Sequence, residues 1–418
     1  MTVAPPWDDG WVGVAEVRYR YRLRVGPGQA RQLQDVFDAC RAVWNQALGR
    51  WGELWAEDGV RLYYRDADRE LTDWRGRWGW LAAQPSVPQQ QVLRDLYRAI
   101  AAFFDRSNPA GRPRFKARKA GYATARWTRN GFAVTGSGRG RPGDRLAVAV
   151  AGGRIGVRVV WSRPLPSPPT SVSVYRDRAG RCWASFVCRL AVPDTASAPA
   201  GRASGVAVFA TTEDPATDIP NPRFARAAAR ALARAQRHLA RAKPGSKHRA
   251  KTRRAKARVE AKVADQRRDF HHKAARALVG AYDRVGVEAL QVKNLSARGR
   301  GRRKTGLNRS IADAGWAQFR RVLAWQAAKA GKTVIPLPAR DSTQRCSACG
   351  AKAKPRIELS ERVFNCASCG LVLGRDRNAA RNLNPDRPGP GGGTGPPGAI
   401  PEGDDGDKTK GPAGVLAA

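Results

Sequence analysis

Near its start the chain alternates apolar and charged residues at every second position. The run EVRYRYRLRV, residues 16–25, has the period of a half-buried β-strand. Its apolar members would face the interior; they are Val17, Tyr19, Tyr21, Leu23 and Val25. Arginines fill the positions between them and would share the opposite face: Arg18, Arg20, Arg22 and Arg24. Such a row is typical of a solvated face and equally of a surface that contacts phosphate, so the pattern leaves both open.

From about residue 28 the apolar residues recur every three or four positions, which predicts an amphipathic helix to about Trp55. A second helix is predicted at residues 89–104, and we interpret its apolar stripe as core. The next stretch, residues 111–132, interleaves Arg114 and Lys116 with aromatic residues, a mixture that combines phosphate contact with stacking on bases. These aromatic residues are Phe115, Tyr122, Trp127 and Phe132.

Short strands are predicted at residues 145–161 and 171–190, with a hairpin turn at 177–180. The proline-rich segment 163–169 would connect them, because proline cannot donate a ladder hydrogen bond. The first half of the chain is therefore predicted to be a β-rich module that helices interrupt. Its boundary falls near residues 193–201.

A strongly basic helical segment follows. Between Arg223 and Arg276 there are 19 Lys and Arg residues against three acidic ones. Five arginines would lie along one helix face: Arg226, Arg230, Arg234, Arg237 and Arg241. The sequence PGSK, residues 244–247, would divide the segment into a helical hairpin that ends near Tyr282. Contact with phosphate would explain so much like charge, and a bare charged helix is the alternative.

Two carboxylates stand out in the second half of the chain. Residues 284–295 have the pattern of a buried strand that carries Glu288, with Val285, Val287 and Leu290 as its apolar members. Asp376 lies at the start of a predicted helix, so the two side chains could converge on Mg²⁺ for phosphodiester hydrolysis. Taken alone, Glu288 is more readily explained as an ordinary ion-pair partner.

Four cysteines form two Cys-x-x-Cys pairs: Cys346, Cys349, Cys366 and Cys369. Two thiolates three residues apart on a tight turn can reach one tetrahedral Zn²⁺, and two such turns complete a closed structural site. We therefore interpret residues 342–370 as a zinc ribbon. Two disulfides are the alternative, but nothing in the sequence resembles a secretion signal.

Charge and composition narrow the class of partner. The 418 residues include 76 Lys and Arg against 35 Asp and Glu, a net charge of +41 that is spread over most of the chain. A polyanionic partner is expected. No apolar run approaches the roughly 20 residues of a spanning helix, so we expect nucleic acid and no membrane, in a cytoplasmic, nucleoid-associated protein of bacterial type. The Gly- and Pro-rich residues 385–418 are predicted to be a disordered tail.

The order of these segments resembles the TnpB family, OrfB-type transposon proteins that are RNA-guided DNA endonucleases and relatives of type V CRISPR effectors. Besides the ribbon, four motifs carry the resemblance. They are IPNPRF at 219–224, VEALQVKNL at 287–295, NRSIADAGWAQFRRVLAWQA at 308–327 and RDRNAARNL at 375–383.

The resemblance implies a multidomain α+β fold. An OB-like wedge β-barrel would comprise residues 14–27 and 120–195, with a helical recognition lobe, 28–119, inserted into it. An RNase H-like α/β domain of the RuvC type would comprise residues 199–341 and 371–384, including the basic helical hairpin 223–282. The zinc ribbon would be inserted into this second domain.

The family's RuvC site uses three carboxylates, and the resemblance carries over two of them, Glu288 and Asp376. The first motif normally places an aspartate between two glycines on the first strand of the fold. The matching stretch here is GRASGVAVFAT, residues 201–211, which has Ala203 at that position. Shifting the alignment by one glycine brings Ala207 to the same place, and neither residue is acidic.

The missing aspartate would normally be a ligand shared by two metal ions, so Mg²⁺ binding is expected to be weak or absent. Glu213 and Asp214 lie ten and eleven residues beyond Ala203, about 33 Å along an extended strand, so replacement by either is not expected.

The resulting expectation is a protein that binds a guide RNA and double-stranded target DNA without cutting it efficiently, with structural Zn²⁺ in its ribbon. An active endonuclease and a decayed transposon product are the alternatives. Contacts with nucleic acid are predicted for Arg18, Arg20, Arg22, Arg114, Lys116, Arg230, Arg234, Arg237 and Arg241.

Overall fold

The computed structural model describes residues 14–57, 59, 63–105, 107, 110–118, 123–138, 140–191, 199–200, 202–204, 208–289, 292–297, 302–338, 341–358 and 361–384. The chain divides into two units. One comprises Met1–Ala191 with Arg234–Ala261, and the other comprises Val192–Ala233 with Lys262–Ala418. Each is described by itself.

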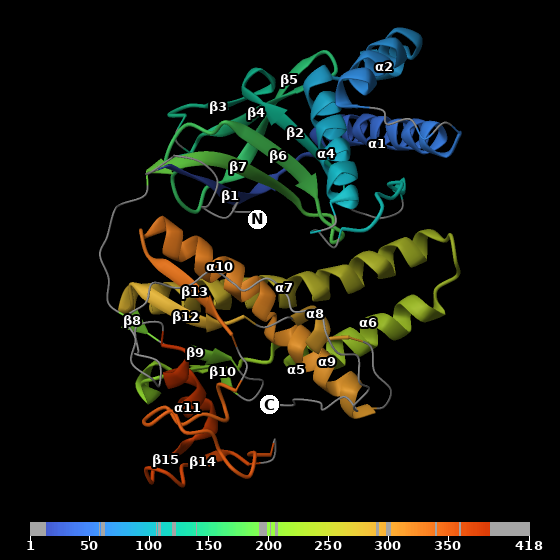
Figure 1. Ribbon diagram of the computed structural model, residues 1–418. Helices are drawn as coiled ribbons and strands as arrows, with labels where there is room; N and C mark the ends of the chain where they lie inside the picture. The colour runs from blue at the N-terminus through green and yellow to red at the C-terminus, as the bar shows by residue number, and fades with distance from the viewer. Residues whose placement is uncertain are drawn as a thin grey trace. The chain divides into compact units, whose positions relative to one another are not determined.

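A seven-stranded antiparallel sheet forms the body of the first unit (Figure 1), in the order β2-β6-β7-β1-β5-β4-β3. Its strands are β1 (Val14–Arg24), β2 (Ala123–Thr128), β3 (Phe132–Thr135), β4 (Arg145–Val150), β5 (Gly153–Val160), β6 (Ser171–Arg176) and β7 (Cys182–Ala191). The two edge strands, β2 and β3, are joined by one 3₁₀ turn, η2 (Arg129–Gly131), so the sheet curls until it is nearly closed.

The alternation in β1 has the predicted consequence. Val17, Tyr19, Tyr21 and Leu23 are all buried, while the arginines between them lie on the other face. On the buried side, Tyr21 packs edge-on against Trp161 and Phe186 with ring centroids 4.7 and 5.8 Å apart. The period of two therefore decides which face of β1 meets the core.

The chain between β1 and β2 forms helices α1 (Pro27–Glu57), α2 (Tyr64–Arg77), α3 (Gly79–Ala82) and α4 (Ser86–Phe104). The two predicted helices, α1 and α4, are confirmed, and they pack on each other and on β2. Helix α2 was missed because its sequence is mostly charged, and only Ala67, Leu71 and Trp74 are buried.

One prediction for residues 111–132 is wrong. Trp127 and Phe132 are buried in the sheet at 0% and 6% exposure, so they are core residues and cannot stack on bases. Phe115 is exposed, and Tyr122 lies outside the described residues. Residues two apart on a strand share one face, and Trp127 lies with Ala125 on the buried face of β2.

The second unit is built on short strands: β8 (Pro199–Ala200), β9 (Arg202–Ser204), β10 (Val208–Thr212), β11 (Ile219–Pro220), β12 (Arg284–Glu288) and β13 (Thr333–Leu337). β12 pairs in parallel with β8 and with β13, whereas β10 pairs antiparallel with β9 and with β11. Its core joins Phe209 of β10, Val285 and Val287 of β12, and Phe319. The predicted strand with Glu288 is thus confirmed, while Leu290 lies outside the described residues.

Helices supply the rest of the second half: α5 (Phe224–Ala227), α6 (Ala229–Arg241), α7 (Lys247–Ala281), α8 (Val292–Leu295), α9 (Arg302–Ala314) and α10 (Trp316–Lys329), besides the 3₁₀ turn η3 (Pro215–Thr217). The predicted helical hairpin is confirmed as α6 and α7. Arg226 lies on the separate short helix α5, so the row of five arginines is divided at Ala228. Among the helices of the described ranges, none is long and apolar enough to span a bilayer.

The last described elements are the hairpin of β14 (Val363–Asn365) and β15 (Val372–Gly374), and helix α11 (Arg375–Asn382) directly after it. The ribbon cysteines precede and follow β14, so the ribbon leads without a linker into the helix that carries Asp376.

Candidate metal centre and nucleic-acid interface

The two Cys-x-x-Cys turns have the same backbone structure. In the first, the N–H of Cys346 donates to Ala351 at 2.8 Å and that of Gly350 donates to Cys346 at 3.0 Å. In the second, Cys366 donates to Leu371 and Gly370 donates to Cys366, both at 2.9 Å. Gly350 and Gly370 have φ of 75° and 70°, the left-handed region that glycine enters without strain. The repeated Cys-x-x-Cys-Gly sequence therefore builds two copies of one turn.

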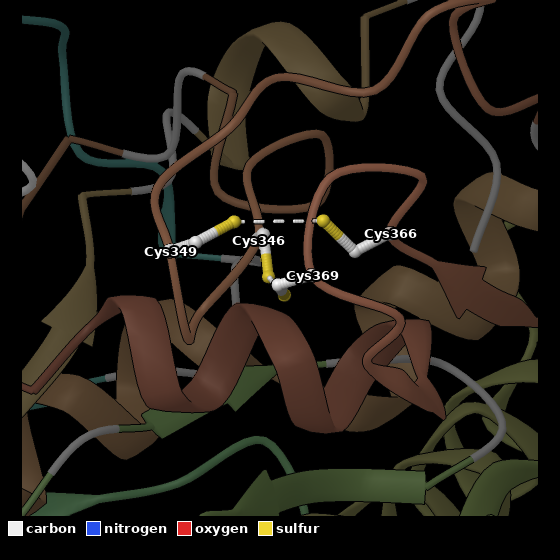
Figure 2. A group of neighbouring side chains, drawn as sticks. All are labelled: Cys346, Cys349, Cys366 and Cys369. Carbon is white, nitrogen blue, oxygen red and sulfur yellow. Dashed lines mark hydrogen bonds between the residues drawn. The ribbon is translucent and has the colours of Figure 1, made fainter.

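These turns bring the four sulfur atoms together, and Figure 2 shows them facing one another. All four lie within 4.8 Å of one another. Cys346 Sγ is 3.6 Å from Cys369 Sγ, and Cys349 Sγ is 3.5 Å from Cys366 Sγ. Four sulfurs about 2.3 Å from one tetrahedral zinc would be about 3.8 Å apart, whereas a disulfide needs about 2.05 Å. The geometry fits Zn²⁺ and contradicts the disulfide alternative.

Hydrogen bonding to sulfur favours the thiolate form in Cys366, whereas the neighbouring cysteine sulfurs raise the pKa of the Cys369 thiol. Backbone N–H groups of Cys369 and Ser368 lower the pKa of the Cys366 thiol to about 6. Within the described residues, the four cysteines are the one group of three or more His, Cys, Asp or Glu side chains placed to hold a metal ion.

Helix α11 is fixed on both sides by the side chains of its motif. Asn378 is fully buried; its Oδ1 accepts from Ser347 N at 2.8 Å and its Nδ2 donates to Arg345 O at 2.6 Å, which clamps the first cysteine turn. On the other side Arg377 forms a bidentate ion pair with Asp218, at 2.8 and 3.0 Å, and donates to Thr212 O of β10 at 2.7 Å.

Asp376 makes little contact within the protein. Its carboxylate is 42% exposed, and the contact the structure gives it is Arg375 Nε at 4.0 Å. The neighbouring Arg375 is instead anchored by donating to Glu358 O at 2.9 Å. A carboxylate held at a fixed helix start, facing solvent, is available to a ligand.

The strand of Ala203 lies near both predicted carboxylates. β9 lies beside β12, which carries Glu288, and against α11, which carries Asp376. Two predicted acids and the alanine thus come from three adjoining elements. The backbone of Glu288 also accepts from Arg320 at 3.3 Å.

The extended separation expected between Ala203 and Glu213 is wrong, because the chain reverses after β9 and β10 pairs antiparallel with Thr211 opposite Ala203. Glu213 follows directly after β10, which ends at Thr212. Asp214 is used locally, because its side chain accepts from Ala216 N at 2.9 Å.

The arginines of β1 are partly engaged inside the protein. Arg20 and Arg22 both lie over the ring of Trp183 on β7, 4.1 and 5.2 Å from its centroid, and Arg181 joins them at 5.1 Å. Burial lowers the pKa of Arg22. Trp183 was missed from the sequence, although its strand position opposite Arg22 follows once β1 and β7 are paired.

Lys116 is similarly drawn inward. Its ammonium lies 3.4 Å from the ring centroid of Trp44 on α1, and burial lowers its pKa to about 8. The backbone of the segment is tied to the same helix, because Trp44 Nε1 donates to Arg114 O and Lys116 N donates to Asn45 Oδ1. This arrangement favours a structural role for Lys116.

The arginines of α6 contrast with these. All four are exposed, and none forms an ion pair within the described part of the chain: Arg230, Arg234, Arg237 and Arg241. The short helix before them is capped by Asp313, whose carboxylate accepts from Ala225 N at 2.8 Å. That contact gives the motif NRSIADAG a structural reason that the sequence did not show.

Three family models match the chain. One described as "Probable transposase", of the OrfB_IS605 type, matches residues 195–298, a Cas12f1-like TNB domain matches 316–383, and a helix-turn-helix domain of OrfB_IS605 matches 16–59. The structure folds this last range as strand β1 and the single long helix α1, and not as two short helices.

Similar proteins extend along most of the chain. A protein of Streptomyces pristinaespiralis described as "Putative RNA-guided DNA endonuclease" is 35% identical over 372 residues, covering 87% of this chain and 88% of the relative. InsQ of Escherichia coli strain K12, with the same description, is 31% identical over 379 residues, 87% of this chain and 90% of its own.

Among solved structures, the Cas12f1-sgRNA-target DNA complex contains a chain that aligns with a TM-score of 0.53 and 13% identity, covering 86% of this chain and 83% of that one. This likeness shows a shared fold. Together with the identity to relatives over nearly nine-tenths of the sequence, it makes the chain a member of the TnpB family, the OrfB-type proteins of IS605 transposons.

Proposed function

We propose that this protein binds double-stranded DNA under the direction of a guide RNA and that its RuvC-type nuclease site is impaired. The observation that carries the proposal is Ala203 on β9, the strand that lies beside β12 with Glu288 and against the helix of Asp376. The activity named for the relatives supports guided recognition. In such recognition, base pairing reads the sequence while the protein holds the heteroduplex by shape and charge.

The site explains why cleavage would suffer. Mg²⁺ supplies an activated water and neutralises the developing charge in phosphodiester hydrolysis. Glu288 and Asp376 would hold it here, whereas Ala203 offers no oxygen ligand. Two carboxylates hold a hard cation less tightly than three, because each removes one charge and one ligand. The protein would therefore occupy its target and block transcription there.

We also assign parts to the two units. The nearly closed sheet would be the OB-like wedge, with α1–α4 as the recognition lobe, and the unit of β8–β13 would be the RNase H-like domain. The exposed arginines of α6 would contact phosphates. Steep loss of binding as salt increases is the signature expected of such contacts.

The test compares the natural protein with Ala203→Asp, each loaded with the RNA that copurifies with it. Ala203→Asn is the matched control, because it has nearly the same shape without the charge. After equal target binding has been shown, Ala203→Asp should cut a guide-matched plasmid in Mg²⁺ roughly 10²- to 10³-fold faster than either. Mg²⁺ should also raise the unfolding temperature of Ala203→Asp, and it should leave those of the natural protein and Ala203→Asn unchanged.

Equal cutting by the natural protein and Ala203→Asp would contradict the impaired site. Absence of copurifying RNA, or of guide-dependent target binding, would contradict guided recognition itself. Glu288→Gln in the Ala203→Asp background should abolish the gained cleavage, since that variant removes a second ligand.

An active endonuclease is the second candidate, and the β9–β10 hairpin is the observation that favours it. Because β10 runs back beside Ala203 and Glu213 follows directly after β10, the Glu213 carboxylate could supply the third ligand. In that case the natural protein cuts, and Glu213→Gln stops it. If the natural protein cuts slowly and Glu213→Gln cuts at the same slow rate, the result supports the proposal that the nuclease site is impaired.

A further inference from the structure

A hollow of about 360 Å³ opens on the outer side of the seven-stranded sheet, where β1, β5 and β4 meet the start of α1. Its lining includes Arg24 at the end of β1, Arg158 of β5 and Arg145 of β4. The remaining lining residues are uncharged, so three guanidinium groups surround it without an acidic side chain. Its volume is within the range of small-ligand sites, about 300–1,000 Å³.

The three arginines form one continuous row across the sheet. Arg24 is the direct register partner of Arg158, and Arg158 is the direct partner of Arg145. Side chains opposite one another on neighbouring strands lie on the same face, about 4.5–5.5 Å apart at Cβ, where like charges destabilise the sheet. All three are exposed, and none has an ion pair with a residue that the structure describes.

The backbone beside them adds to the positive potential. Helix α1 begins at Pro27, runs for 31 residues and has no acidic residue in its first turn. Its N-terminal dipole charge is therefore uncompensated. Gln29 fixes this helix end to the sheet, because its Oε1 accepts from Gly26 N at 3.0 Å and its Nε2 donates to Gly156 O at 2.9 Å.

This row differs from the arginines around Trp183. There an indole ring, and Asp177 bonded to Arg181 at 2.7 Å, offset the positive charge. Around the hollow, no described side chain offsets the positive charge of the three arginines. A bound anion is the simplest means of balancing three facing guanidinium groups and a helix N-terminus, and phosphate matches the donor geometry of arginine.

We propose that this hollow binds a phosphate group of a nucleic-acid backbone. The phosphate would lie between Arg24, Arg158 and Arg145, with the α1 N-terminus at its side. That the phosphate belongs to a nucleic acid rests on the proposed function. Contacts of this kind fix the register of a strand without reading its sequence.

The experiment substitutes the central arginine, Arg158→Gln, in the full chain. Arg154→Gln is the matched control, because it removes the same charge from the same face of the same strand, outside the hollow. Two probes are used: sodium phosphate against sodium chloride at equal ionic strength in thermal unfolding, and labelled single-stranded RNA or duplex DNA in salt titrations.

Phosphate should raise the unfolding temperature of the natural protein and of Arg154→Gln, and it should lose that effect in Arg158→Gln. In chloride Arg158→Gln should be at least as stable as the natural protein, because repulsion is relieved. The slope of log affinity against log salt should fall by about 0.7 for single strands or about 0.9 for duplex, and the probe that responds identifies the strand.

The proposal is overturned if Arg158→Gln keeps both the phosphate effect and the salt slopes, or loses no more than Arg154→Gln does. A phosphate effect with unchanged slopes on both nucleic acids would overturn the nucleic-acid assignment. If the natural protein binds neither RNA nor DNA, both the proposed function and the assignment of the phosphate to a nucleic acid fail. Thermal unfolding in phosphate against chloride still decides whether the hollow binds an anion.

Discussion

The four-cysteine cluster and the proposed carboxylate site both depend on one helix, α11, yet only the cluster has its full set of ligands. Its four cysteines converge within 4.8 Å, and Asn378 ties the first cysteine turn to the helix. The proposed carboxylate site has Glu288 and Asp376 but an alanine at position 203. The same helix therefore adjoins a complete set of metal ligands and a proposed catalytic site that lacks one.

Stability explains why these two sites can differ. Loss of a cysteine removes a metal ligand on which the fold of the ribbon depends. A carboxylate at position 203 would instead add a negative charge to a strand that lies beside β12, the strand of Glu288. An alanine there costs the fold nothing, so only the chemistry is affected.

Removing a ribbon ligand should have the largest effect. Cys366→Ser is expected to lose zinc, which contributes on the order of 10 kcal/mol to the folding of small zinc domains. Zinc content and limited proteolysis of residues 342–384 measure the change. Cys182→Ser, half-buried on β7, should keep both at the level of the natural protein. Full zinc in Cys366→Ser would break the contrast between the two sites.

Acid should destabilise the core under the carboxylate site. His271 is fully buried among Phe209, Phe270 and Phe319, and burial lowers its pKa to about 4. Between about pH 6.5 and pH 4 the unfolded chain binds the proton and the folded chain does not. Stability is therefore lost as pH falls through that window, by about 3 kcal/mol.

The control for this prediction keeps the hydrogen bond of His271 to Ala314 O, 2.9 Å long. His271→Gln can still donate there but cannot be protonated, so it should flatten the pH dependence. His238→Gln, on the exposed face of α6, should leave it unchanged. Tryptophan fluorescence reports this unfolding, and zinc release is followed separately so that acid loss of the ribbon is not mistaken for it.

Uncoupling the ribbon from α11 should have the smallest effect. Asn378→Leu keeps the side-chain volume but leaves the buried N–H of Ser347 without a partner, at a cost of about 2 kcal/mol. The rate of amide hydrogen exchange in α11 should rise, and a chelator should remove zinc from the protein faster. Asn382→Leu removes hydrogen bonds to Ser342 and Arg345 that are nearer the solvent, so both rates should rise less in that variant. Equal effects would show that Asn378 is not the link.

Much of this protein could be predicted locally. The period of two in β1, the helical periods of α1 and α4, the basic hairpin and the spacing of the cysteines each depend on neighbours in sequence, and each is confirmed. The helix α2 was missed because a mostly polar helix gives little periodic signal. The fate of Trp127 and Phe132 was misjudged because exposure depends on which face of the sheet is covered.

Tertiary pairing decided the rest. The sequence alone established the family resemblance, the spacing of the four cysteines and the absence of an acid at Ala203. Only the folded chain decided that the strand of Ala203 lies beside the strand of Glu288, that Thr211 pairs with Ala203, and that Arg24, Arg158 and Arg145 form one row. These relations join residues far apart in the sequence, and they follow from the register of paired strands, which no local pattern encodes.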